Sequence, residues 1–107
     1  MATATPRPGA TPTPTPVTVV SVQDFSFTPA MVTVHVGDTV QWNWAGGTHS
    51  TTSGPCPPCS SDGHWDSGVK SAGSTFSHTF TSSDLGTRPY YCSVHLTLMT
   101  GTVQVNP

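Results

Sequence analysis

The sequence of 107 residues lacks several features that common protein classes require. It contains no Glu, and only three of its residues are Lys or Arg. Helical bundles and coiled coils are rich in Glu, Lys and Leu, so this composition excludes them. Three scattered cations form no basic surface for nucleic acid or an anionic membrane. No apolar run approaches the roughly 20 residues of a membrane-spanning helix. We therefore expect neither a nucleic-acid partner nor a membrane span.

The residues that are present favour β-structure. Val, Thr, Phe, Trp and Tyr are plentiful after residue 16, and apolar positions alternate with polar ones. This alternation predicts strands, separated by turn residues, near 17–27, 32–36, 40–44, 76–80, 88–92 and 101–105. Residues 45–74 are rich in Gly, Ser and Pro and read as loop, and 82–86 as a turn or one short helical turn. The pattern predicts an all-β, antiparallel Greek-key β-sandwich of about seven to eight strands, and an immunoglobulin-like domain fits it equally well.

The N-terminal segment differs from the rest. Residues 1–16 hold five of the eleven Pro and five Thr, with no large apolar side chain beyond Met1. Such a segment cannot bury a core, so we expect an extended linker, residues 1–16, before a folded domain, residues 17–107. It is either a solvated tail or, as we favour, a stalk remaining after removal of an export signal or anchor. The stalk interpretation implies an extracytoplasmic (periplasmic or cell-surface) protein.

The most informative segment lies near the C-terminus. Cys92, His95 and Met99 place a thiolate, an imidazole and a thioether within eight residues, on the connection between two predicted strands. These soft donors suit copper better than magnesium or calcium. Two His and one Cys in a plane, with a weak axial Met, form the donor set of a blue-copper electron-transfer site. His49, after a Gly-rich loop, is the candidate for the second imidazole.

Seven stretches of the chain resemble the cupredoxins, and most closely the plastocyanin, amicyanin and halocyanin branch. They are DFSFTPA at 24–30, VGDTVQW at 36–42, WNWAGGTH at 42–49, WDSG at 65–68, FSHTF at 76–80, YYCSVH at 90–95 and MTGTV at 99–103. The resemblance extends from about Val17 to Val105. Two departures are visible: three residues separate His95 from Met99, where the relatives considered have two or four, and Ser50 stands where Asn often follows the first histidine.

The resemblance implies a type 1 copper protein that binds one copper ion. His49, Cys92 and His95 would be the equatorial ligands and Met99 the axial one. It also implies a one-electron carrier that exchanges electrons through the ring edge of His95. Leu96 and Leu98 are available for an apolar patch that docks redox partner proteins, and we expect a monomer.

Two cysteines and three histidines remain outside this set. With Cys92 assigned to copper, Cys56 and Cys59 remain as a pair, and we favour a short-range disulfide in an exported protein. The alternatives are a second metal site with His64 and a pair of reduced thiols. We expect His35 to be a solvated strand residue and His78 a half-buried packing residue.

The same fold also serves other functions. Cupredoxin domains also build copper enzymes, which place a His directly beside the ligand cysteine. The neighbours of Cys92 are Tyr91 and Ser93, so we expect no enzyme. The main alternative is an extracytoplasmic copper-binding or delivery protein without redox turnover. A metal-free adhesion-type sandwich would leave Cys92, His95 and Met99 unexplained.

Overall fold

The computed structural model describes residues 17–107, and the predicted linker at 1–16 lies outside the described residues. The described chain consists of strands and one 3-10 turn, η1. No helix among residues 17–107 has the length and apolar character needed to cross a membrane. In chain order the elements are β1 (Val17–Gln23), β2 (Ser26–Thr28), β3 (Met31–His35), β4 (Thr39–Trp44), β5 (Thr48–His49), β6 (Thr52–Ser53), β7 (Lys70–Ser71), β8 (Thr75–Thr79), η1 (Ser82–Asp84), β9 (Gly86–Cys92) and β10 (Leu96–Asn106).

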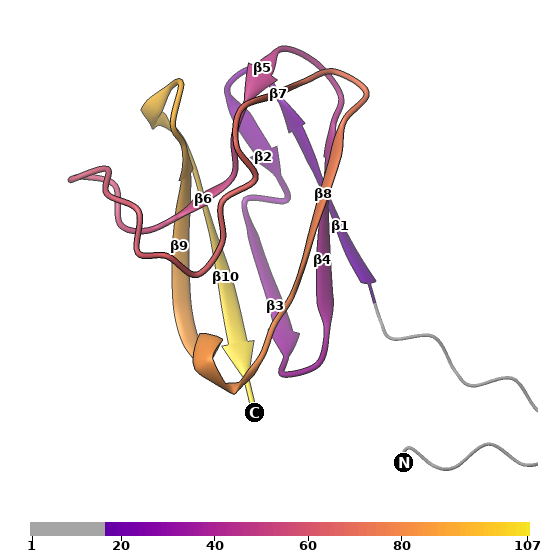
Figure 1. Ribbon diagram of the computed structural model, residues 1–107, viewed down its shortest axis with the longest axis vertical. Helices are drawn as coiled ribbons and strands as arrows, with labels where there is room; N and C mark the ends of the chain where they lie inside the picture. The colour runs from indigo at the N-terminus through magenta and orange to yellow at the C-terminus, as the bar shows by residue number, and fades with distance from the viewer. Residues whose placement is uncertain (1–16) are drawn as a thin grey trace, which may run out of the picture.

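Two four-stranded sheets pack into the predicted β-sandwich (Figure 1). Their strand orders are β2-β1-β4-β8 and β3-β10-β9-β6, and β5 and β7 form a small third sheet. The predicted β-sandwich is confirmed, but two pairs depart from the expected antiparallel pairing, because β1 runs parallel to β4 and β10 runs parallel to β3. The reason is connectivity. After the hairpin of β1 and β2 in one sheet, the chain crosses to the other sheet in β3 and returns to the first in β4. As a result β1 and β4 point the same way.

The first predicted strand is interrupted. The sequence predicts one strand running into Phe25 and Phe27, but the structure turns at Asp24 and Phe25 and pairs Val22 with Phe27 across a hairpin. Phe25 has a φ of 75°, a left-handed conformation that is uncommon outside glycine. Its side chain is 56% exposed, whereas that of Phe27 is 2% exposed. The step of three residues from Val22 to Phe25 shifts the period of two at this turn, a signal that sequence reasoning missed.

The core lies between the two sheets and follows the alternation closely. Inward-facing Val and aromatic residues from both sheets form one buried cluster. Fully burying each such side chain stabilises the fold by about 1.5–3 kcal/mol. Trp65, within the stretch read as loop, belongs to this cluster and stacks on Trp42 with ring centroids 5.6 Å apart. Trp65 therefore anchors the long segment between β6 and β7 to the core.

The segment read as loop carries more order than its composition suggests. It contains the two-residue strands β5, β6 and β7, and residues 50–53, all Ser or Thr, are buried. Cys56 and Cys59 form the favoured disulfide. The predicted turn at 82–86 contains η1, and His35 is exposed as expected.

Candidate metal centre

His49 is placed by a short strand and a glycine. It ends β5, which pairs with β7, and its side chain is completely buried. Its backbone carbonyl accepts a hydrogen bond of 2.9 Å from Trp44 Nε1, which ties the strand to the core. Gly47, two residues earlier, has a φ of 75°, and a Cβ at this position would overlap the His49 ring. The position of the His49 imidazole therefore requires glycine at residue 47.

Cys92 and His95 are placed by the tight connection between β9 and β10. The register pairs Cys92, the last residue of β9, with Leu96, the first residue of β10. His95 therefore lies in the turn, where its backbone carbonyl accepts a hydrogen bond from Leu98 N at 3.2 Å. Cys92 is fully buried and is the free cysteine among the described residues, and His95 is partly exposed.

The three side chains converge on one point. Nδ1 of His49 lies 3.2 Å from Nδ1 of His95, and Sγ of Cys92 lies 3.8 Å and 3.5 Å from these two nitrogens. The centre of a triangle with these sides is about 2 Å from each corner, close to the usual metal–nitrogen distance and slightly short of the metal–sulfur distance. One thiolate and two imidazoles in a plane match the chemistry of a copper site, so these residues fit the metal.

Met99 occupies the irregular start of β10. The pairing of β9 with β10 shifts register between Leu96 and Thr100, and Met99 falls within that bulge. Its side chain is 1% exposed and belongs to the same buried cluster as Cys92. The bulge turns Met99 inward while Leu96 and Leu98 are 47% and 73% exposed.

A hydroxyl group links the two segments that carry the donors. Ser50 Oγ donates to Ser93 Oγ at 2.9 Å and accepts from Ser93 N at 2.9 Å. Thr52 Oγ1 lies 2.9 Å from the same hydroxyl. The residue after His49 is thus bonded to the residue after Cys92, although 43 positions separate them. Sequence reasoning noted Ser50 only as a departure from the family and did not anticipate this contact.

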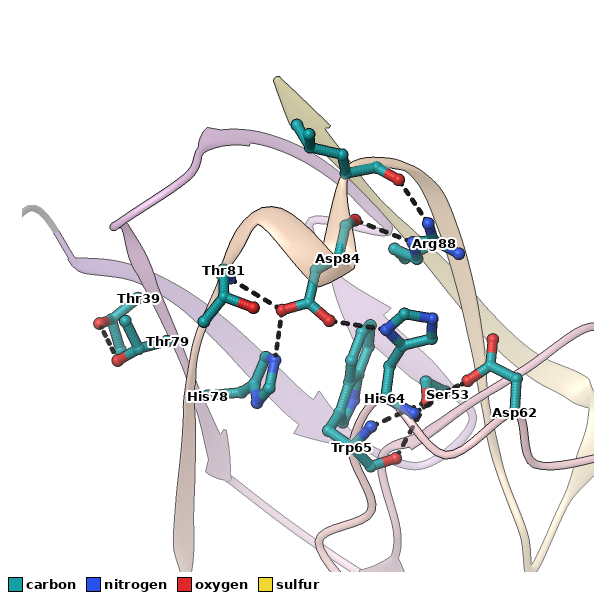
Figure 2. Close-up of polar contacts among 11 residues, drawn as sticks. Thr39, Ser53, Asp62, His64, Trp65, His78, Thr79, Thr81, Asp84 and Arg88 are labelled. Atoms are coloured by element: carbon teal, nitrogen blue, oxygen red, sulfur yellow. Dashed lines mark hydrogen bonds and ion pairs between the residues drawn. The ribbon is translucent and has the colours of Figure 1, made fainter. Parts of the chain in front are cut away.

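A second polar cluster lies at the other end of the sandwich, around η1 (Figure 2). The carboxylate of Asp84 accepts hydrogen bonds from Thr81 N at 2.9 Å, His64 Nδ1 at 2.6 Å and His78 Nε2 at 3.1 Å. Burial alone would raise the pKa of Asp84, but the hydrogen bonds from Thr81, His64 and His78 outweigh it and hold the pKa below its usual value. His78 is half-buried as expected, but sequence reasoning missed its carboxylate partner.

The alternative of a second metal site made by His64, Cys56 and Cys59 was wrong. The two cysteines are bonded to each other, and Nδ1 of His64 is directed at Asp84.

Comparisons with known proteins agree with this geometry. The family described as copper binding proteins, plastocyanin/azurin family, matches residues 15–106. Halocyanin from Natronomonas pharaonis is 40% identical over 74 residues, which are 66% of this chain and 42% of that protein. The chain thus spans less than half the length of this relative.

Solved structures show the same architecture. An amicyanin mutant in its reduced state superposes with a TM-score of 0.69 at 25% identity, covering 84% of this chain and 82% of the other. A purple cupredoxin from Nitrosopumilus maritimus gives a TM-score of 0.72 at 22% identity, covering 83% of this chain and 99% of the other, and supports the fold alone. The chain belongs to the plastocyanin/azurin family of copper binding proteins, a cupredoxin whose cofactor is one copper ion.

Proposed function

We propose that this cupredoxin is a type 1 blue-copper protein that carries single electrons between partner proteins. The observation that carries the proposal is the convergence of Cys92 Sγ, His49 Nδ1 and His95 Nδ1 at one end of the sandwich. In this proposal His49, Cys92 and His95 are the equatorial ligands and Met99 the axial ligand. When bound, copper supplies the Cu(II)/Cu(I) couple.

The protein's contribution is to hold the donors still. His49 and Cys92 are fully buried, and the Ser50–Ser93 hydrogen bonds connect their segments. A site held in one arrangement by its scaffold needs little reorganisation when the charge of the metal changes, which favours fast electron exchange. No bond of a substrate needs to form or break, so the proposal is a carrier and not an enzyme.

The electron route in this proposal passes through His95. Of the two imidazoles, that of His95 is the one partly exposed. Exposed apolar side chains flank it on the ligand loop, namely Val94, Leu96 and Leu98, which are 47%, 47% and 73% exposed. This surface, which contains the predicted docking residues Leu96 and Leu98, is suited to weak apolar docking of a redox partner. The net charge of −2 leaves little electrostatic steering, so the rate should depend weakly on salt.

The alternative function is copper binding or delivery without redox turnover. The complete burial of Cys92 and His49 disfavours it, because an enclosed thiolate and imidazole release metal slowly. The two functions predict opposite kinetics: a carrier exchanges electrons faster than it loses copper to a chelator, and a delivery protein does the reverse.

Copper titration tests the proposal. Adding Cu(II) to the wild-type protein should produce an intense thiolate-to-copper visible band that bleaches reversibly on reduction. Cys92→Ser should abolish the band. The matched control, the double variant Cys56→Ser and Cys59→Ser, should retain it because those sulfurs are bonded to each other. Absence of the band in the wild type would overturn the blue-copper assignment.

We also propose an extracytoplasmic location and a monomeric state. A disulfide between Cys56 and Cys59 is typical of an oxidising compartment. Residues 1–16, as a stalk, would tether the domain to the cell surface. Protease treatment of intact cells tests the location, since loss of the domain without lysis is expected. Light scattering during gel filtration should give the 11.2 kDa monomer mass.

A further inference from the structure

The turn between β1 and β2 lies at the same end of the sandwich as β5 and the ligand loop (Figure 1). Its two residues, Asp24 and Phe25, are each directed at one imidazole of the metal centre. Neither residue is a copper donor in the proposed function. Their contacts with both histidines therefore need a separate explanation.

Asp24 meets the nitrogen of His49 that faces away from the other donors. Oδ1 of Asp24 lies 3.1 Å from Nε2 of His49, whose side chain is fully buried. Within residues 17–107, Nε2 of His49 has no hydrogen-bond partner, and Oδ1 of Asp24 is the carboxylate oxygen within ion-pair distance of it. A histidine that donates the Nδ1 lone pair to a metal must carry its proton on Nε2, and an acceptor there fixes the tautomer. The Asp24 carboxylate lies within hydrogen-bond distance of that nitrogen but outside hydrogen-bond geometry, so acting as the acceptor requires the exposed carboxylate to turn toward it.

Gly47 provides an independent observation. A Cβ on Gly47 would overlap both Oδ1 of Asp24 and Nε2 of His49. The carboxylate and the imidazole thus meet in the space that the missing side chain leaves. Three parts of the chain, the turn between β1 and β2, the approach to β5 and β5 itself, fit together at this one contact.

Phe25 meets the second imidazole. Its ring lies edge-on to that of His95, with centroids 4.8 Å apart and planes at 86°. Such an arrangement is a favourable aromatic contact. The left-handed φ of 75° at Phe25 costs conformational energy, and such outliers gather at functional sites. The backbone is held in an uncommon conformation that places the ring against His95.

We propose that the Asp24–Phe25 turn positions both histidines of the metal centre. Asp24 holds the Nε2–H tautomer of His49, and Phe25 fixes the ring plane of His95. The inference rests on the proposed function, because it takes these histidines as the metal ligands. The competing interpretation is a surface carboxylate of little consequence, since Asp24 is 62% exposed.

The metal-free protein provides the first test, by side-chain ¹⁵N NMR of the histidines. His49 should be an Nε2–H tautomer in the wild type, should lose that preference in Asp24→Ala and should regain it in Asp24→Asn, whose amide oxygen still accepts. Asp38→Asn is the matched control, because it removes the same charge in the turn between β3 and β4, at the opposite end of the sandwich. An unchanged His49 tautomer in Asp24→Ala would overturn the role of Asp24. This result does not require copper, so it remains distinct from failure of the blue-copper assignment.

Copper affinity provides the second test, using Cu(I) competition with a chromogenic chelator. Asp24→Ala should lower the affinity about 10-fold or more, as loss of a partner to a metal-bound histidine does, and Asp24→Asn should recover most of it. An affinity within twofold of the wild type, matching that of Asp38→Asn, would contradict the proposal.

Phe25 is tested by Phe25→Leu, which keeps an apolar side chain but removes the aromatic ring. We expect at least a threefold change in the ratio of Cu(II) to Cu(I) at a fixed applied potential, together with a shifted visible spectrum. If the ratio and the spectrum both equal those of the wild type, Phe25 contributes apolar surface only, and its positioning role is wrong.

Discussion

Removing the buried carboxylate of Asp84 should destabilise the domain strongly while leaving its copper site intact. The side chain is 4% exposed and accepts hydrogen bonds from Thr81 N, His64 Nδ1 and His78 Nε2 (Figure 2). A hydrogen bond to a charged group contributes about 1.5–3 kcal/mol, and contacts that share one acceptor do not add fully. For Asp84→Ala we therefore expect a loss of about 3 kcal/mol, and for Asp84→Asn, which keeps one acceptor oxygen, about half of that.

The pH dependence gives a sharper form of the same prediction. The pKa of Asp84 is lowered from 3.8, so its contribution is fully present above the unfolded-state value and is lost as pH falls through the lower folded-state pKa. The difference in unfolding free energy between the wild type and Asp84→Asn should shrink as the pH falls below about 5, because the unfolded-state carboxylate takes up its proton at a higher pH than the folded-state one.

Urea denaturation of the metal-free proteins measures both effects, and the visible spectrum of the copper-loaded proteins reports on the metal centre. In the metal-free state Asp24→Asn is the control, because its carboxylate is 62% exposed and should contribute little to stability. For a domain of this size, a loss of about 3 kcal/mol also lowers the melting temperature by roughly 12–24 °C. An Asp84→Ala protein as stable as the control, or an Asp84→Asn difference that grows below about pH 5, would refute the reasoning. An altered visible band would show that the cluster is coupled to the distant copper site.

Three further changes test other parts of the structure. Ser50→Ala should cost about 1 kcal/mol in unfolding free energy and broaden the visible band, because the hydroxyl joins the segments of His49 and Cys92; an unchanged unfolding curve and band would show that the link is dispensable. Leu98→Asp should slow electron exchange with the native partner without changing the melting temperature, because this side chain is 73% exposed; an unchanged rate in stopped-flow measurements would exclude its docking role. Reducing the Cys56–Cys59 disulfide should lower the unfolding free energy by about 2 kcal/mol while the copper band persists, and a lost band would contradict its separation from the metal centre.

The candidate donors could be predicted from the sequence because most of them lie close together along the chain. Cys92, His95 and Met99 fall on one strand connection, and their residue types limit the metal. His49 was a candidate because it follows a Gly-rich loop, and the resemblance to a family supported that choice among the other histidines. The tight connection between Cys92 and Leu96 then brings His95 to the end of the sandwich that holds His49.

Contacts that depend on the path of irregular chain could not be predicted. His64 and His78 reach Asp84 from positions 20 and 6 residues away, and only the fold of the long segment before β7 brings the first of them there. The turn at Phe25 was missed because Phe25 and Phe27 are themselves two residues apart and look like a continuation of the strand. The parallel pairing of β1 with β4 follows from where the chain changes sheets, which residue patterns along a single strand do not record.

The central position of β10 in its sheet, between β3 and β9, has a consequence for the order of assembly. During synthesis β10 is the last strand of the described domain to emerge, yet both its neighbours need it to complete their pairing. A nascent chain that ends before β10 has no partner for β3 and lacks Met99 entirely. His49 and Cys92 can therefore reach their final arrangement only after the last strand is inserted. Copper uptake should thus follow completion of the fold, so that metal loading distinguishes finished molecules from unfinished ones.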